Sequence, residues 1–241
     1  RSSGWLPSRE VAPDGRPSVE LLAADLVALA ETLELEDMLA VGWSMGAMVL
    51  WRALLTGLAE RTAGMAVVDM TPRIVNDAGW SLGLRGGYDA SAARAAQAAM
   101  VADWPAFAAA LARAVVADGL DAERRPLIDW VAGEVIHNEP HALSHLWGSL
   151  AEQDFRADLE RFELPSLIVH GARSQLYDAA TSLYLEDRLP DARRISFDRS
   201  GHAPHLEEPD RFNRVITDFA ATLEGRDRPR TSRPARATPQ T

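Results

Sequence analysis

The sequence predicts an α/β fold built on a parallel β-sheet, and three observations lead to this prediction. Short apolar runs with the length of strands alternate with longer segments that have helical spacing. A serine flanked by glycines stands where one strand-like run meets a helix-like run. The chain has 241 residues, 47% of them hydrophobic, which suits one domain with a sizeable core. Strands separated by helices pair in parallel and bring their carboxyl ends to one edge of the sheet.

The first elements follow from apolar spacing and from capping residues. Ser18 is expected to cap a helix over 19–33. A short buried strand at 38–42 precedes a helix that is apolar on most sides and stops at Gly57. A second apolar strand covers 63–68. The first helix carries a stripe of leucines at 4-3-4 spacing, namely Leu22, Leu26, Leu29 and Leu33.

The middle of the chain changes character, because it is rich in alanine and contains no strand-like run. It is too long for a loop, which predicts a helical insertion. Strands at 167–170 and 194–197 and helices at 179–188 and 209–223 resume the alternation. The predicted organisation has four segments: one half of the α/β core at 1–73, the insertion at 74–158, the other half of the core at 159–224, and a tail at 225–241 with too little apolar surface to fold.

Composition excludes several classes of protein. The net charge of −10 argues against a nucleic-acid partner. The absence of cysteine rules out disulfides, a thiolate nucleophile and cysteine-based metal sites. No apolar run approaches the ~20 residues of a membrane helix, and no signal-peptide pattern is visible. We therefore expect a cytoplasmic protein without a membrane partner.

The stretch Gly42-Trp43-Ser44-Met45-Gly46 carries the strongest chemical signal. A nucleophilic serine on a tight strand-to-helix turn has strained backbone angles and an exposed hydroxyl. Such a turn is expected to leave no room for a Cβ two residues before or after the serine, so both positions are glycine. The alternative is a glycine-rich βα turn in some other α/β protein.

A serine nucleophile needs a base to accept its proton and a third group to orient that base. His202 is the candidate base, because it lies in a loop between the fourth strand and the last helix. His205 is the second candidate, and a solvated surface histidine is the plain alternative. The chain order, with the nucleophile first and the histidine last, favours His202.

The segments "VGWSMGA" and "SGHAPHLEEPDRF" resemble the corresponding segments of the α/β-hydrolase superfamily, and the likeness extends over residues 17–224 by element order. They are similar to those of pimeloyl-carrier-protein methyl ester esterases and related small carboxylesterases. The resemblance implies that Ser44 is the nucleophile, that His202 is the base and that the helical insertion is a lid. It also implies that the Met45 N–H donates to the oxyanion and that no cofactor is needed.

The position of the acidic residue that would orient His202 differs from the pattern of these relatives. They commonly carry an aspartate just past the strand before the histidine, but in "HGARSQLYDAA" Ser174 occupies that place. Another branch of the superfamily, which includes haloalkane dehalogenases, carries its acid after the strand that follows the nucleophile helix, and Asp69 stands there. We predict Asp69 as the acid, with Asp178, Asp198 or a site without an acid as alternatives. Asp69 could also simply cap the turn that follows it.

The N-terminal part of the chain also differs from the superfamily pattern. Nothing upstream of Val19 can supply the strands that precede the nucleophile strand in this superfamily, or the oxyanion loop that ends one of them. The opening "RSSGW" resembles the end of a later loop. These features predict a chain whose N-terminal strands are missing, with the second oxyanion donor upstream of Arg1.

Other residues carry weaker signals. Trp43 is expected to line the acyl pocket, and His170 is expected to be structural. Three histidines spaced by four suggest a metal site, but Pro140 interrupts the helix that would align them, so no metal is predicted. These histidines are His137, His141 and His145.

The function predicted from these residues is that of a serine hydrolase. It would cleave a small carboxylic ester or thioester through an acyl-enzyme, without a cofactor. Two alternatives remain open: a cofactor-free perhydrolase or lyase on the same site, and a non-catalytic binding module that keeps the fold.

Overall fold

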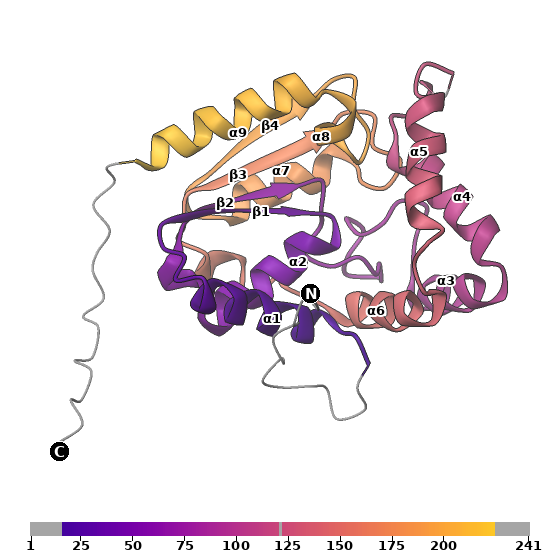
Figure 1. The fold of residues 1–241 in the computed structure, drawn as a ribbon, viewed down its shortest axis with the longest axis horizontal. Helices are drawn as coiled ribbons and strands as arrows, with labels where there is room; N and C mark the ends of the chain where they lie inside the picture. Colours follow the sequence, from indigo (N-terminus) through magenta and orange to yellow (C-terminus); the bar gives the residue numbers. More distant parts are fainter. Residues whose placement is uncertain (1–15, 121, 225–241) are drawn as a thin grey trace, which may run out of the picture.

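The computed structural model describes residues 16–120 and 122–224. Within these residues the strands form one parallel sheet in the order β1-β2-β3-β4, which confirms the predicted α/β class (Figure 1). The strands are β1 (Met38–Trp43), β2 (Thr62–Val68), β3 (Ser166–Gly171) and β4 (Ala192–Phe197). The similarity noted for "RSSGW" and the predicted tail at 225–241 lie outside the described residues.

Helices cover both faces of the sheet. Along β2, Met65 and Val67 join the cluster that contains Trp51, whereas Ala66 and Val68 join the cluster that contains Phe219. This alternation follows from the two-residue period of a strand. The first face carries α1 (Val19–Thr32), α2 (Met45–Ala53) and α7 (Ala179–Arg188), and the second carries α9 (Pro209–Leu223).

The cap of α1 is confirmed, but its leucine stripe does not form the buried face. The Ser18 side chain accepts a hydrogen bond of 3.1 Å from the Leu21 N–H. Leu29 and Leu33 are 47% and 57% exposed. The buried positions of α1 are instead Val19, Ala23 and Ala30. The two alanines carry only a methyl group, so they let α1 approach the core closely.

The helix after the serine ends in an irregular turn. The regular part of α2 stops at Ala53, and a π-helical turn η1 (Leu54–Leu58) contains Gly57 with a φ of 143°. A short 3₁₀ turn η2 (Ala59–Arg61) then leads into β2. The prediction of a stop at Gly57 is therefore correct to within a few residues, because only glycine adopts this φ without strain.

Among the described residues, four α-helices lie between β2 and β3, beyond the carboxyl ends of the strands (Figure 1). Residues 74–89 form a loop with one isolated bridge between Asp77 and Trp80 before the first of these helices begins. The helices are α3 (Ala90–Ala102), α4 (Trp104–Val115), α5 (Arg125–Val135) and α6 (Pro140–Glu152), followed by the 3₁₀ turn η3 (Leu159–Arg161). A search of the described residues finds no helix that is long and apolar enough to cross a membrane.

Candidate active site

Ser44 stands on a strained turn between β1 and α2. Its φ of 53° and ψ of −130° lie where an ordinary residue is rarely found. The Ser44 N–H donates to the Val68 carbonyl at 3.1 Å, so the neighbouring strand holds the turn in place. Such strain persists only where the surrounding structure over-determines it, and it is concentrated at functional sites.

The two glycines beside Ser44 are not equivalent. A Cβ on Gly42 would lie 2.5 Å from the Cα of Ala47, so no side chain fits there. A Cβ on Gly46 would have no atom within 4 Å. The expectation that both positions exclude a Cβ is therefore correct for Gly42 and wrong for Gly46 in the described structure, because Gly46 is exposed on the first turn of α2.

This difference gives a paired prediction on stability. Gly42→Ala should destabilise the protein by about 1–3 kcal/mol, because the methyl group must push the first turn of α2 away from β1. Gly46→Ala should be neutral or stabilising by up to ~1 kcal/mol, because alanine is the better helix former. Urea unfolding of the two variants checks both values. Equal losses of stability would contradict the assignment of the close contact to Gly42 alone.

Asp69 follows β2 and lies beside Ser44 in the sheet. The register pairs Trp43 with Val68, so the next residue on each strand leaves the sheet at the same edge. Asp69 has a φ of 45°, and its N–H donates to the Val169 carbonyl at 2.8 Å. Asp69 Oδ2 lies 2.9 Å from His202 Nδ1. Since an ionised carboxylate only accepts hydrogen bonds, Nδ1 of His202 is the donor.

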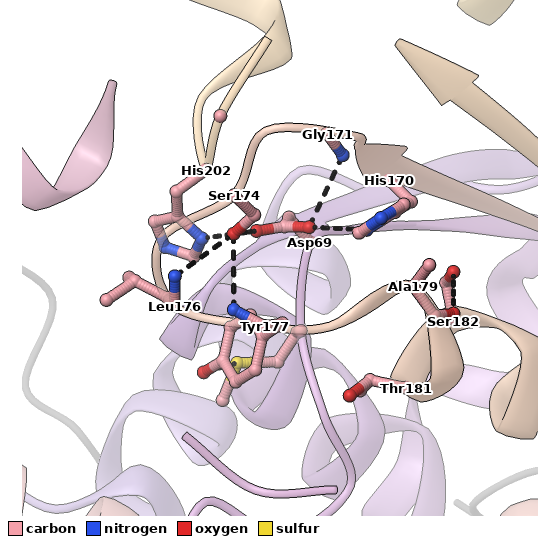
Figure 2. Close-up of polar contacts among 12 residues, drawn as sticks. Asp69, His170, Gly171, Ser174, Leu176, Tyr177, Ala179, Thr181, Ser182 and His202 are labelled. Carbon is pink, nitrogen blue, oxygen red and sulfur yellow. Dashed lines mark hydrogen bonds and ion pairs between the residues drawn. The ribbon is translucent and has the colours of Figure 1, made fainter. Parts of the chain in front are cut away.

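Three further donors surround the Asp69 carboxylate (Figure 2). His170 Nδ1 lies 3.0 Å from Oδ1, and the Ser174 hydroxyl donates to Oδ2 at 2.7 Å. The Gly171 N–H donates to Oδ1 at 3.4 Å. Burial alone would raise the pKa of the Asp69 carboxyl, but the bonds from His170, His202 and Ser174 offset this effect and hold the pKa below its usual value of 3.8.

His170 and Ser174 are therefore partners of Asp69, which sequence reasoning missed. The signal for Ser174 was present, since the resemblance described above implies an acid at its position. A carboxylate at that position would face Asp69, whereas a hydroxyl donates to it. The alternative acids lie elsewhere: Asp178 is 58% exposed at its side chain and pairs with Arg85 at 3.0 Å, and Asp198 is exposed.

His202 is 2% exposed and is held by its backbone as well as by Asp69. Its N–H donates to the Val115 carbonyl at 3.0 Å, and its carbonyl accepts the Trp43 indole N–H at 2.7 Å. Trp43 packs against the apolar cluster beneath α9, and its indole N–H links the serine turn to the histidine loop. That Trp43 lines the acyl pocket stays a prediction.

His205, the second candidate base, does not reach Asp69. It lies on the short helix α8 (Pro204–Glu207), edge-on to Trp43 with the ring centroids 4.6 Å apart, and its Nδ1 is buried without a hydrogen-bond partner in the described structure. Burial, followed by the charge of His202, lowers the pKa of His205 from 6.5 to about 4. A base also needs an orienting acid, so this geometry favours His202.

The lowered pKa of His205 predicts how stability depends on pH. Between pH 6.5 and 4 the unfolded chain binds a proton that the folded protein resists, so stability should fall as the pH is lowered through this window. The effect is at most about 3 kcal/mol, and partial exposure of the ring reduces it. Urea unfolding of wild type and His205→Gln across this range checks the prediction. The variant should show the flatter dependence, and parallel curves would contradict it.

Among the described residues, the side chains of the two other predicted site residues, Met45 and Ser44, form no hydrogen bond with Asp69 or His202. Met45 is the first residue of α2, where no carbonyl of the same helix can accept its N–H. Ser44 directly follows β1 and His202 lies in the loop after β4, so both come after the carboxyl ends of strands. Catalytic hydrogen bonds often tighten only when substrate is present.

The residues resolved by the structure contain no group of three or more side chains that could hold a metal ion. His137 lies before α6, while His141 and His145 lie on it, so the three histidines do not share one helix. The reason is Pro140, which begins α6 at the first helical position.

Comparison with known proteins assigns the class. Residues 4–215 match the model described as "Alpha/beta hydrolase family", and the chain belongs to that family. Solved structures agree on the fold. The chain resembles an esterase from Exiguobacterium antarcticum and a bromoperoxidase from Bacillus anthracis, each with a TM-score of 0.77, at 18% and 20% identity. Each likeness covers 85% of this chain and 74% of the other.

Among sequences, the chain is similar to proteins named pimeloyl-[acyl-carrier protein] methyl ester esterase. It is 28% identical over 203 residues to the one from Chromobacterium violaceum, covering 83% of this chain and 75% of the relative. It is 31% identical over 193 residues to the one from Aromatoleum aromaticum, covering 76% and 74%. These relatives agree with the family suggested by the serine and histidine segments.

Proposed function

We propose that this protein is a serine hydrolase that cleaves a small carboxylic ester or thioester through an acyl-enzyme. The observation that carries the proposal is the bond of 2.9 Å between His202 Nδ1 and Asp69, at the sheet edge where Ser44 stands on a strained turn. The proposal is also supported by the esterase names of the relatives. Their carrier-protein substrate is a property of those proteins, and for this chain we propose only the ester class.

Each residue has a defined part in the proposed reaction. Asp69 holds the Nδ1–H of His202, which leaves Nε2 unprotonated and able to accept the hydroxyl proton of Ser44. Ser44 then attacks the ester carbonyl, and the Met45 N–H at the start of α2 stabilises the oxyanion. His202 passes its proton to the leaving alcohol or thiol. A water molecule, activated by the same histidine, hydrolyses the acyl-enzyme.

The helices between β2 and β3 complete the proposal. Since α3 to α6 lie beyond the carboxyl ends of the strands, where Ser44 and Asp69 lie, we assign them the part of a lid over the acyl group (Figure 1). A lid excludes water and positions the substrate. The predicted division of the chain into a helical insertion at 74–158 and a second half of the α/β core at 159–224 is part of this proposal.

The test uses a fluorophosphonate probe and a short-chain 4-nitrophenyl ester. The probe should attach covalently to Ser44, located by mass spectrometry, and should abolish release of nitrophenolate. Covalent label elsewhere, or ester turnover that survives labelling, would contradict the proposal. Absence of both labelling and turnover would favour a binding module, and halogenation with peroxide in place of turnover would favour a perhydrolase.

A further inference from the structure

Glu207 is a buried carboxylate that lies outside the proposed triad. It is the last residue of α8, and its side chain has no solvent exposure. Its Oε1 accepts the N–H of Gly201 at 2.7 Å, and its Oε2 accepts the N–H of Ala117 at 2.8 Å. Gly201 precedes His202, and Ala117 lies two residues beyond the end of α4. The carboxylate therefore joins two segments that are far apart in the sequence.

The two segments also touch through their backbones. The N–H of His202 donates to the carbonyl of Val115, the last residue of α4. A Cβ on Gly201 would lie 2.5 Å from the carbonyl carbon and oxygen of Val116, so only glycine permits this approach. The segment 115–117 thus packs directly against the loop that carries His202.

The same segment contacts the loop that carries Ser174. The side-chain amide of Gln175 donates to the Val116 carbonyl at 3.0 Å. The Asp118 N–H donates to the Arg173 carbonyl at 2.9 Å. The end of α4 therefore lies between the two loops that supply His202 and Ser174 to Asp69.

The charge of Glu207 is compensated by these two bonds and by an ion pair with Arg124. Burial raises the pKa of its carboxyl above the usual 4.5, and the N–H groups of Ala117 and Gly201 and the charge of Arg124 counteract this only in part. Arg124 Nε lies 3.6 Å from Oε2, beyond a good hydrogen bond. Removal of the carboxylate would leave two buried N–H groups without their acceptor.

We propose that Glu207 is a positioning residue for His202: by accepting the N–H groups of Gly201 and Ala117, its carboxylate fixes the histidine loop to the segment after α4. The inference rests on the proposed function, because it takes His202 as the base. It also implies that the end of α4 stays in place beside His202. Any movement of the proposed lid is then confined to the rest of helices α3 to α6.

The test compares Glu207→Gln with Glu208→Gln. The amide introduced by Glu207→Gln can accept only one of the two N–H groups, and its NH₂ group faces the other. Glu208 is a matched control, because it accepts the Ser200 hydroxyl at 2.6 Å in the same loop but has no bond to segment 115–117. We expect kcat of Glu207→Gln to fall about 10- to 100-fold with KM little changed, as for a misplaced catalytic group. Hydrogen exchange should rise in both the 113–119 and 198–206 segments. Neither the loss of kcat nor the rise at 113–119 should appear in Glu208→Gln.

The outcomes separate this inference from the proposed function. The proposed function is tested first, by ester turnover and probe labelling of the wild-type protein. In an active enzyme, a lowered melting temperature of Glu207→Gln with unchanged kcat would assign the residue an ordinary structural role and overturn the inference. Equal loss of kcat in both glutamine variants would also overturn it. In an inactive wild type, unchanged exchange at 113–119 in Glu207→Gln would overturn it.

A shorter carboxylate keeps the test possible if Glu207→Gln does not fold. Glu207→Asp retains the charge but reaches one methylene less far, so it can keep only one of the two bonds. Its kcat should lie between those of wild type and the glutamine variant, and the exchange of segment 113–119 should rise. Wild-type kcat together with wild-type exchange would contradict the inference.

Discussion

Ser44→Ala should lower kcat by about 10⁴ to 10⁶, the range seen when a triad nucleophile is removed. Stability should stay within about 0.5 kcal/mol of wild type. The physical reason is that the Ser44 side chain makes no capping hydrogen bond to α2, while alanine has the same backbone strain at a φ of 53°. Steady-state ester hydrolysis and urea unfolding give the two numbers. Turnover above a tenth of wild type would exclude Ser44 as nucleophile.

Ser44→Gly separates catalysis from strain at the same position. Glycine adopts positive φ without penalty, so this variant should be inactive and more stable than wild type by about 1 kcal/mol or more. An inactive variant with greater stability is difficult to explain by unfolding. A loss of stability in Ser44→Gly would contradict the strained-turn interpretation.

Asp69→Asn should lower kcat by roughly 10⁴, because His202 loses the acceptor that selects its Nδ1–H tautomer. Asparagine tolerates the φ of 45°, so the backbone of the turn should survive. The amide has one oxygen for donors from His202, His170 and Ser174, so stability should also fall, by about 1–3 kcal/mol for an unsatisfied buried group. Ester kinetics at a temperature well below the melting transition separate the two effects.

Asp178→Asn is the matched control for this variant. Asp178 is an exposed carboxylate paired with Arg85, so its loss should leave kcat near wild type and change stability by less than about 0.5 kcal/mol. If Asp178→Asn abolished turnover and Asp69→Asn did not, the acid would belong to the loop after β3. The contact between His202 and Asp69 would then be structural only.

The elements whose signal is local could be predicted without the structure. The helices at 179–188 and 209–223 were predicted with the bounds that the structure shows, because apolar spacing and flanking prolines act within a few residues. The order of strands and helices determined a parallel sheet, and that sheet placed Ser44 and Asp69 at one edge. The glycine at position 42 was also readable, since it contacts the helix that directly follows.

Which side chains contact one another could be seen only in the folded chain. Asp69 receives donors from His170, Ser174 and His202, which lie 101, 105 and 133 positions away in the chain. No periodicity encodes such contacts, because they depend on how the loops after β3 and β4 pack over the sheet edge. The sequence did not predict the buried face of α1, the packing of Trp43 or the bonds of Glu207 with Gly201 and Ala117 for the same reason. Local patterns specify elements, whereas contacts between distant segments specify the geometry of the site.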